Sequence, residues 1–486
     1  MSKEKLLINL FERWAGEKAE EIYMLPRSGS YREYYRLKST GKSALGVYNE
    51  DFKENKAFIS FTNHFYKNGI NVPEIYAEDL SDHIYLQQDL GDTTLFSYLN
   101  NHREGSELPS ELVALYKKIV SDLPEIQVKA GTSLDYSVCY PRASFDEQSM
   151  HWDLNYFKYY FLKLAKIPFD EQELEDDFRE FSEYLLQEDR DYFLYRDFQS
   201  RNIMICNNEP YYIDYQGGRK GALQYDLASL LYDAKADLPQ QLRNELLEIY
   251  LTKLAQIKKI DKARFRQFYQ GYVLIRIMQA MGAYGFRGFY EKKTHFLQSI
   301  PYALDNLSFI LDNYDLPIEI PHLRKVLGLL VDAPKLRQYR DFSVSSHGLQ
   351  ISITSFSFKK GLPVDESGNG GGFVFDCRGI HNPGRYEEYK QMSGKETPVI
   401  EFLKDNSQIE EFLNHVFEVV DLTIDNYITR NFSHLMVNFG CTGGQHRSVF
   451  SAEALAAHLK EKYNLKIKLK HRELEKMQLR PLNHQP

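Results

Sequence analysis

Hydrophobic positions change their period twice along the chain, and these changes divide it into three stretches. In the first ninety residues short alternating runs predict strands, residues 43–48 and 83–88 among them, around a helix at 57–67. Residues 95–311 repeat apolar side chains every three to four positions, which is the spacing of amphipathic helices. From residue 350 onward strands and helices alternate, an order typical of an α/β domain with parallel strands.

Long helices dominate the middle stretch, with one interruption. The spacing predicts them over residues 112–123, 154–164, 240–254 and 265–281. Two short apolar runs, 203–206 and 211–214, predict a pair of strands, because the sequence between them, Asn207-Asn208-Glu209-Pro210, is typical of a tight turn.

The C-terminal stretch is predicted to be a separate domain. Strands are expected at 350–358, 373–378, 434–439 and 465–469, and helices at 409–429 and 448–462. Four glycines within residues 365–372 predict a mobile loop between the first two of these strands. The predicted organisation is a small lobe at 1–90, a helical lobe at 91–335, a linker at 336–347 and an α/β domain at 348–486.

Composition narrows the class of protein. The chain of 486 residues is 43% hydrophobic and 26% charged, which fits a globular protein, and no run of about 18 apolar residues predicts a membrane span. A net charge of −8 argues against a general nucleic-acid coat. The charged start predicts no signal peptide, and the four cysteines form no CxxC pair, so neither a disulfide scaffold nor a zinc site is expected. The expected compartment is a reducing cytoplasm.

A first group of chemical residues surrounds the predicted hairpin. Asp197 and Asn202 stand five residues apart in the loop before it, and Asp214 follows its second strand. Phosphoryl transfer needs a carboxylate that orients or deprotonates the attacking hydroxyl, and an amide and a second carboxylate that hold Mg²⁺ against nucleotide phosphates. The spacing alone is common, but its placement between loop, strand and turn favours this chemistry.

These residues resemble the signature of the aminoglycoside phosphotransferase and choline kinase-like superfamily, His-x-Asp-x4-Asn followed by an Ile-Asp strand end. Tyr195 stands where the family has histidine, and Asp226 stands where an aspartate usually braces the catalytic loop. The resemblance implies a protein-kinase-like bilobal α+β fold, with a small mixed sheet in the N-lobe and a helical C-lobe. It also implies ATP and Mg²⁺ as cofactors, Asp197 as the catalytic residue, and Asn202 and Asp214 as metal ligands.

Segments of the first ninety residues are similar to sugar kinases that phosphorylate N-acetylmuramate and N-acetylglucosamine at the anomeric carbon in cell-wall recycling. These segments are residues 25–37, 71–75 and 88–92. The resemblance implies nucleotide binding by Ser28, Gly29, Ser30, Arg36, Gln88 and Leu90. An ordinary hairpin turn at residues 28–30 and solvated strand faces at Arg32 and Arg36 are the alternatives.

Two questions about this half stay open: which cation replaces the usual strand lysine, and which residues contact the sugar. A typical kinase has a lysine on the third strand, but residues 43–48 have none, and Arg27, Arg32 or Arg36 could supply the missing charge. For sugar recognition the comparable helix offers Asp146 and Asp153, whose carboxylates could accept hydroxyl hydrogen bonds. Capping of a helix N-terminus explains them equally well.

The strongest local signal is the run from Gly440 to Ser448, Gly-Cys-Thr-Gly-Gly-Gln-His-Arg-Ser, between an apolar strand and a helix. Backbone amides, the helix dipole and nearby cations make such a turn an anion site, with phosphate as its natural ligand. One interpretation is the Cys-x5-Arg-Ser pattern of cysteine-dependent phosphatases, in which Cys441 would be the nucleophile. Against it, Gly440 stands where those enzymes usually have histidine, and no general-acid loop is evident.

The other interpretation covers more sequence, because residues 350–475 resemble the C-terminal domain of the RNase adapter RapZ. That resemblance implies binding of glucosamine 6-phosphate and contacts with RNA and protein. The implied ligand residues are Asp376, Arg378, Asn382, Cys441, Thr442, Gly443, Gly444, His446 and Arg447. Gln445 stands where the adapter usually has lysine. A basic strip at 466–472 could contact RNA, although a solvated edge strand is the simpler explanation.

The sequence hypothesis is a cytoplasmic two-domain protein. An ATP-dependent kinase acting on an amino sugar of the N-acetylhexosamine type precedes a domain that binds a phosphorylated amino sugar and adjusts the first. The alternatives are a nucleotide- and phosphosugar-binding signalling adapter without phosphotransfer, and a cysteine phosphatase in the last domain. An RNA or protein partner and a homo-oligomer stay open.

Overall fold

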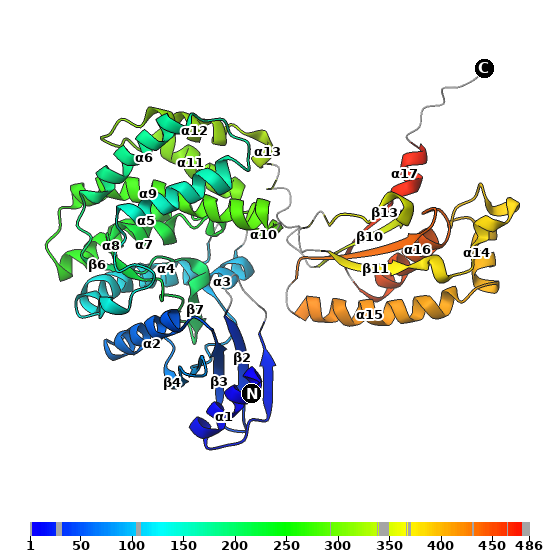
Figure 1. Cartoon of the computed structure of the whole chain (residues 1–486), viewed down its shortest axis with the longest axis horizontal. Coiled ribbons are helices and arrows are strands. Elements are labelled where there is room, and N and C mark those ends of the chain that lie inside the picture. The colour runs from blue at the N-terminus through cyan, green and yellow to red at the C-terminus, as the bar shows by residue number, and fades with distance from the viewer. Residues whose placement is uncertain are drawn as a thin grey trace. The chain divides into compact units, whose positions relative to one another are not determined.

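The computed structural model describes residues 2–25, 32–103, 108–291, 293–337, 339, 349–365, 367, 371–429, 432–463 and 465–478. Its contacts define two compact units (Figure 1). One comprises Met1–Phe286 and Ser299–Arg337, and the other comprises Arg287–Gln298, which includes α10 (Thr294–Leu297), and Gln338–Pro486. Across the described residues, every helix is too short or too polar to pass through a lipid bilayer.

The first unit begins with a five-stranded sheet in the order β1-β2-β3-β5-β4. The strands are β1 (Glu21–Met24), β2 (Glu33–Lys38), β3 (Ser43–Tyr48), β4 (Ile75–Asp79) and β5 (Ile84–Gln87). All four pairings are antiparallel, so the predicted mixed sheet is wrong in this detail. The reason is connectivity: β1 to β3 and β4 to β5 follow one another directly, and the helical crossover after β3 leads to the far edge of the sheet.

Two helices pack with this sheet, where the sequence predicted one. α2 (Phe52–Lys67) begins five residues earlier than expected, because the Asp51 side chain accepts a hydrogen bond from the Glu54 N–H and caps the helix. α1 (Lys3–Ala15) was not predicted. It buries Leu7 and Phe11 against Leu37 of the sheet and forms the core of the small lobe.

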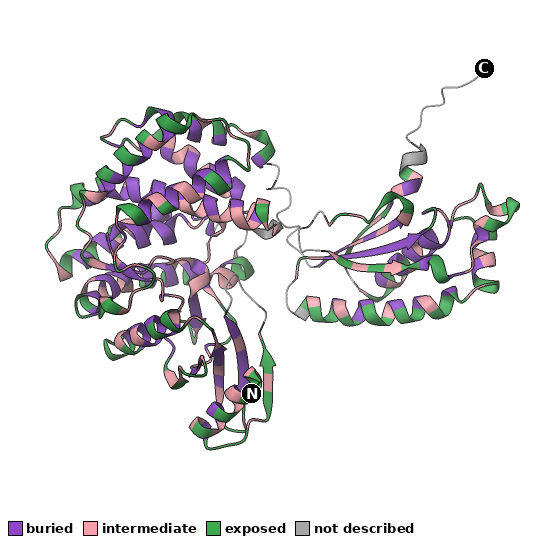
Figure 2. Cartoon of the chain, in the orientation of Figure 1, coloured by how far each residue is buried: buried purple, intermediate pink, exposed green. Residues whose placement is uncertain are grey.

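Helices make up most of the remainder of this unit. They are α3 (Leu95–His102), α4 (Ser110–Pro124), α5 (Glu147–Phe157), α6 (Glu171–Leu186), α7 (Gln224–Leu231), α8 (Gln240–Ile257), α9 (Lys262–Tyr284), α11 (Ile300–Asn313), α12 (Pro321–Val331) and α13 (Pro334–Arg337). The predicted helix at 154–164 is divided between α5 and a π-helical turn, Lys158–Leu162. α9 is largely buried among its neighbours (Figure 2). The unit has the bilobal α+β fold expected from the resemblance.

Two short ribbons interrupt the helices, where the sequence predicted one. β7 (Ile203–Cys206) pairs with β8 (Glu209–Tyr212), and the turn between them is the two-residue Asn207-Asn208, with φ of 53° and 62°. The strand predicted at 211–214 therefore starts two residues earlier, and Asp214 lies beyond it. β6 (Tyr192–Leu194) pairs with β9 (Arg219–Gly221). Strands of three residues are too short to show a period, which is why this second ribbon was not predicted.

The C-terminal unit contains a four-stranded parallel sheet in the order β11-β12-β10-β13, which confirms the predicted α/β domain. The strands are β10 (Gln350–Ser357), β11 (Gly372–Asp376), β12 (His434–Cys441) and β13 (Lys466–His471). The helices are α14 (Thr397–Asp405), α15 (Ile409–Thr429), α16 (Arg447–Lys462) and α17 (Arg472–Gln478). β13 is an edge strand, as expected for the basic strip. Much of the predicted glycine loop and of the predicted linker lies outside the described residues.

Candidate functional site

The side chain of Asp226, on α7, holds the loop at residues 195–202 by hydrogen bonds to its backbone. The Asp226 carboxylate accepts hydrogen bonds from the backbone N–H of Tyr195 (2.8 Å) and of Arg196 (3.0 Å), and from Gln127 Nε2 (3.0 Å). Burial raises the pKa of Asp226 to about 7 despite these donors. Tyr195 is buried, and its hydroxyl donates to the carbonyl of Ile213. The residue that replaces the family histidine therefore ties the loop to the chain just before Asp214.

Asp197 presents a carboxylate that has no partner. Among the described residues no group donates a hydrogen bond to it and no cation lies within ion-pair distance, although it is only partly exposed. The side chain of Asn202 fixes the backbone of the same loop, because its Nδ2 donates to the Asp197 carbonyl at 2.9 Å. This bond leaves the Asn202 amide oxygen without a partner among the described groups. Asp197 is thus free to accept a proton from a bound hydroxyl.

Asp214 lies close enough to influence this loop electrostatically. It has a φ of 70°, and its Oδ1 accepts a hydrogen bond from Gln216 Nε2 at 2.7 Å. Burial is the main cause that raises the pKa of Asp214 to about 6, and the charge of Asp197 adds to it. In the described chain no three His, Cys, Asp or Glu residues gather as a metal site. The Asp214 carboxylate and the oxygen of Asn202 do suit Mg²⁺, which takes few protein ligands and completes its shell with phosphate and water.

Arg32 is a buried cation that pairs with a carboxylate of α2. It is 2% exposed, and its Nη2 lies 3.3 Å from Oε1 of Glu54 in the first turn of α2. Gln216 connects this pair to the loop, since its Nε2 lies 3.4 Å from Glu54 Oε1 and 2.7 Å from Asp214 Oδ1. Burial lowers the pKa of Arg32, but Tyr85, Tyr34, Glu54 and Asp214 raise it by more.

The other two arginines are not equivalent to Arg32. Arg36 is held by two carboxylates, with Nε 2.7 Å from Asp89 Oδ2 and Nη2 2.9 Å from Asp92 Oδ1. Hydrogen bonding to Asp92 is the largest cause that raises the pKa of Arg36. Arg27 lies outside the described residues, as do the predicted nucleotide residues Ser28, Gly29 and Ser30.

The segment after β5 offers backbone groups to a nucleotide. Gln88 N–H donates to the Glu74 carbonyl at 2.8 Å, which fixes the segment to the start of β4. The N–H of Leu90, a buried residue, donates to no other described group. A free N–H at the connection between a small sheet lobe and a helical lobe can bind a flat heterocycle edge-on.

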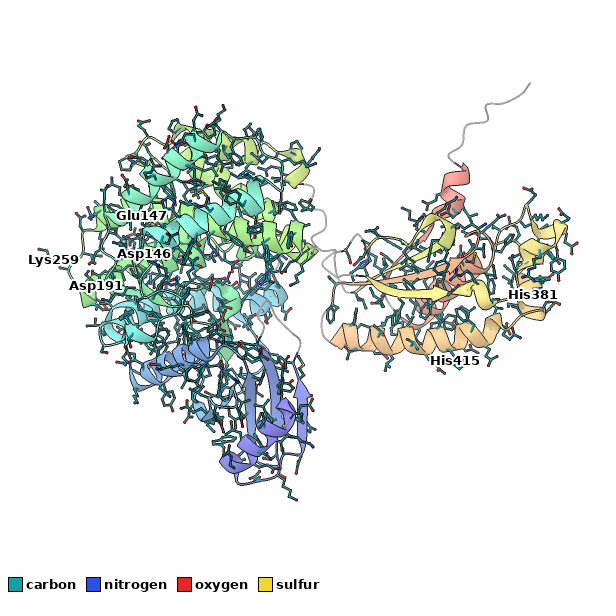
Figure 3. All side chains as sticks on the ribbon, viewed as in Figure 1. Asp146, Glu147, Asp191, Lys259, His381 and His415 are labelled. Atoms are coloured by element: carbon teal, nitrogen blue, oxygen red, sulfur yellow. The ribbon has the colours of Figure 1, made fainter. Side chains whose placement is uncertain are left out.

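Asp146 and Asp153 are both engaged in this structure. Asp146 caps α5, since it accepts a hydrogen bond from the Ser149 N–H at 3.1 Å, and it pairs with Arg142; it stands beside Glu147 at the start of the helix (Figure 3). For Asp146 the structure thus shows the capping alternative. Asp153 binds Arg196 through two bonds, Oδ2 to Nη1 at 2.7 Å and Oδ1 to Nη2 at 2.5 Å. This ion pair, which was not predicted, anchors the residue next to Asp197 on α5.

In the C-terminal unit the glycine-rich loop joins β12 to α16. Gly444 N–H and Ser448 Oγ each lie 3.1 Å from Cys441 Sγ. Gly444 has a φ of 71°, and a Cβ there would lie 2.8 Å from the Ser357 nitrogen, so a larger residue does not fit. Within the described chain the N–H groups of Gly443, Gln445 and His446 donate to nothing. They form a nest at a helix N-terminus, which suits an anion.

The other predicted ligand residues lie around this loop. Arg447 is 4% exposed; its Nη1 donates to the carbonyls of Arg378 (3.0 Å) and Ile380 (2.7 Å), and its Nη2 to Thr442 Oγ1 (3.5 Å). Asp376 stands in register with Gly440 and binds Arg378 through its carboxylate.

Asn382 caps a short turn by accepting from the Gly384 N–H, and a Cβ at Gly384 would lie 3.1 Å from the His446 ring. The nine predicted residues therefore gather at one end of the sheet.

The phosphatase interpretation finds little support in this geometry. A Cβ at Gly440 would lie 2.3 Å from the ring of Phe358, so the histidine of the phosphatase pattern has no room. The Cys441 side chain is buried beneath the loop.

Comparison with known proteins finds a match in each of the two units. The RapZ C-terminal domain model matches residues 349–475, and that of the phosphotransferase enzyme family matches residues 25–267. The chain is similar to a "Nucleotide-binding protein" of Glaesserella parasuis, with 39% identity over 144 residues, which cover 30% of this chain and 48% of that protein. It is also similar to a "Nucleotide-binding protein" of Endomicrobium trichonymphae, with 37% identity over 166 residues, which cover 34% of this chain and 52% of that protein. The chain spans about half the length of the curated relatives it matches.

Two solved kinases also align with the chain. A choline kinase from Cryptosporidium parvum is 12% identical with a TM-score of 0.46, covering 67% of this chain and 100% of that one. An amicoumacin kinase is 13% identical with a TM-score of 0.44, covering 66% and 97%. Because its family model matches half of this chain, the protein belongs to the phosphotransferase enzyme family.

Proposed function

We propose that residues 1–335 transfer the terminal phosphoryl group of ATP to a hydroxyl of an amino sugar, and that residues 348–486 bind a phosphorylated amino sugar. The observation that carries the kinase proposal is the free Asp197 carboxylate in a loop that Asp226 holds rigid. A carboxylate kept without partners while its backbone is fixed at several points is suited to accept a proton from a bound hydroxyl.

The remaining residues have roles that follow from their unpaired groups. Asn202 and Asp214 would hold Mg²⁺ through the oxygens that other described groups leave free. When bound, the metal neutralises charge on the nucleotide phosphates. Arg32, oriented by Glu54, supplies the cation that kinases usually place on the third strand. We assign it this role in preference to Arg36, which two carboxylates already neutralise.

Nucleotide binding is completed by the connection after β5. Leu90 would donate its free N–H to the base, and Gln88 would keep the segment in place through its bond to Glu74. Ser28, Gly29 and Ser30 are proposed to approach the phosphates. An acceptor lying over Asp197 would also lie near α5, where Asp153 positions Arg196 and Asp146 caps the helix.

In the second unit, the free N–H groups at the N-terminus of α16 support phosphate binding. Gly443, Gln445 and His446 direct these groups into one turn, and Arg447 adds a buried cation. The sugar is proposed to contact the residues at the end of β11, Asp376 and Arg378, together with Asn382.

The kinase proposal is tested by ATP turnover with a panel of N-acetylhexosamines. Asp197→Ala is expected to lower kcat by about 10²–10⁴-fold, the usual contribution of a general base. Asp191→Ala is the matched control: it removes an exposed carboxylate six residues away, visible in Figure 3, that pairs only with Lys220 among described groups. Turnover of no hexosamine, or equal activity of Asp197→Ala and wild type, would contradict the proposal. Nucleotide binding without transfer would instead select the adapter alternative.

A further inference from the structure

Arg219 of β9 is a buried cation whose terminal nitrogens have no partner. Its residue surface is 7% exposed, and its one hydrogen bond runs from Nε to the Gly217 carbonyl at 3.0 Å. Neither Nη group donates to any described residue, and no described carboxylate lies within ion-pair distance. A buried guanidinium normally has its donors satisfied, since leaving them unpaired is unfavourable.

Other buried arginines of the described chain differ from it. An Nη group of Arg243 donates a hydrogen bond to Asn306, and one of Arg276 donates to Gln279. An Nη group of Arg447 donates to two carbonyls. Arg243 and Arg447 also have a fully buried, unpartnered Nε, whereas Arg219 contributes no atom of that kind. The unpaired end of Arg219 is therefore not sealed in the core, and it remains in reach of a ligand.

The strand position of Arg219 is close to the loop that contains Asp197. Arg219 pairs in register with Leu194, the last residue before the loop that contains Asp197. The next residue, Lys220, contacts the segment that leads into α5, because its backbone N–H donates a hydrogen bond to the Ala143 carbonyl at 2.9 Å.

The charges that act on Arg219 come from the same surroundings. Burial first, and the Arg196 guanidinium second, lower the pKa of Arg219, while Asp153 and Asp197 oppose this shift. β9 itself pairs with the strand that leads into the Asp197 loop and hydrogen-bonds to the segment that leads into α5. Around Asp214, the cation that acts on the carboxylate is Arg32, together with the charges of Asp197 and Glu54. Arg219 therefore belongs with the acceptor, and Arg32 with the nucleotide.

We propose that Arg219 binds an anionic group of the acceptor, so that the substrate is an acidic amino sugar carrying a carboxylate or a phosphate ester. This inference rests on the proposed kinase function and adds a charge requirement to it. Two free Nη groups on one planar guanidinium match the two oxygens of such an anion. An anion would also provide the partner that Arg219 lacks.

The test compares three acceptors that share one ring: N-acetylglucosamine, its lactyl ether N-acetylmuramate, and N-acetylglucosamine 6-phosphate. In the wild type, kcat/KM for at least one anionic acceptor is expected to exceed that of the neutral sugar. Arg219→Gln is expected to lower that value by about 10- to 100-fold, as for a charge-assisted hydrogen bond, and to change the neutral sugar less than about threefold. The acceptor that loses most identifies carboxylate or phosphate as the recognised group.

Lys220→Gln is the control, because this neighbour is exposed to solvent on the same strand and pairs with Asp191. If Arg219→Gln loses equally on neutral and anionic acceptors, or if the wild type prefers the neutral sugar, the inference is overturned. The kinase proposal would still stand, because acceptors are turned over in both cases. Turnover of no acceptor would refute the kinase proposal and the inference with it. If Arg219→Gln fails to fold, Arg219→Lys keeps the charge without the planar fork and is expected to show the same selective loss in smaller measure.

Discussion

Asp226 combines deep burial with three N–H donors, and these two influences on its charge oppose each other. Burial is the larger, and it raises the pKa of this carboxyl to about 7, from about 3.9 in an unfolded chain. Between these values the folded state binds more protons than the unfolded state. The contribution of Asp226 to the free energy of unfolding is therefore fully present below about pH 4 and is lost as the pH rises to about 7.

Asp226→Asn removes this titration. The variant is expected to gain stability relative to wild type as the pH rises from 4 to 8, by about 3–4 kcal/mol over that range. Urea unfolding of both proteins across the range measures the difference, and groups that titrate in both cancel. A difference that does not depend on pH would mean that the donors from Tyr195, Arg196 and Gln127 keep the carboxylate ionised throughout.

The Arg32–Glu54 pair allows a second test at the level of single residues. Because Glu54 orients Arg32, Arg32→Gln and Glu54→Gln are each expected to lower kcat/KM for ATP by about 10- to 100-fold. The double variant should lose little more than either single one, since both changes break one interaction. Arg36→Gln serves as the comparison: its guanidinium is already neutralised by Asp89 and Asp92, so a smaller effect on ATP is expected. Additive losses in the double variant would show that the two residues act separately.

At the level of elements, the turn between β12 and α16 contains two adjacent glycines in different surroundings. A Cβ at Gly444 would press on Ser357 and on Glu473 Cγ at 2.6 Å, and the residue has a positive φ; a Cβ at Gly443 would meet no atom within 4 Å. Gly444→Ala is expected to destabilise the C-terminal unit by about 1–3 kcal/mol and to weaken glucosamine 6-phosphate binding. Gly443→Ala should change stability by less than about 0.5 kcal/mol. Denaturation curves and calorimetric titration measure both, and equal effects would contradict the assigned geometry.

How far elements could be predicted depended on whether they show a period. β3 and α15 were predicted with their observed ends, and β10 and α8 to within a few residues, because their apolar positions repeat over several turns or pleats. α1 was not predicted, although its buried side chains Leu7, Leu10 and Phe11 have helical spacing. β6 and β9 were missed because each has three residues, and their pairing is long-range.

In the candidate site, too, some residues could be predicted from local sequence and others depend on long-range contacts. Asp197, Asn202 and Asp214 could be read from spacing, because chain-local order fixes where a loop presents them. Arg219 could not, because its chemistry depends on the absence of a partner, and the partners of a buried side chain come from distant segments. The Arg196–Asp153 pair joins residues 43 positions apart, and no local pattern reports such a contact.

For the whole molecule, the proposal links a unit of the phosphotransferase enzyme family and a proposed phosphate-binding turn through one class of ligand. If a phosphorylated amino sugar in the second unit adjusts the first, the coupling must act in both directions with one free energy. Glucosamine 6-phosphate is expected to lower the affinity of the full chain for acceptor in the presence of a non-hydrolysable ATP analogue, by at least about fivefold. Saturating acceptor should then weaken the binding of glucosamine 6-phosphate to the analogue-bound chain by the same factor.

Calorimetric titration of each ligand in the absence and presence of the other measures both factors. Unphosphorylated glucosamine is the control, because it lacks the anion that the free N–H groups of Gly443, Gln445 and His446 would bind. Two unequal factors would point to overlap at one site, since an acidic phosphosugar could also reach Arg219 and compete directly with the acceptor. Arg219→Gln separates these cases: competition at the acceptor site would decline in this variant, whereas coupling between the two units would persist. Affinities that do not change in either direction would show that the two units bind their ligands independently.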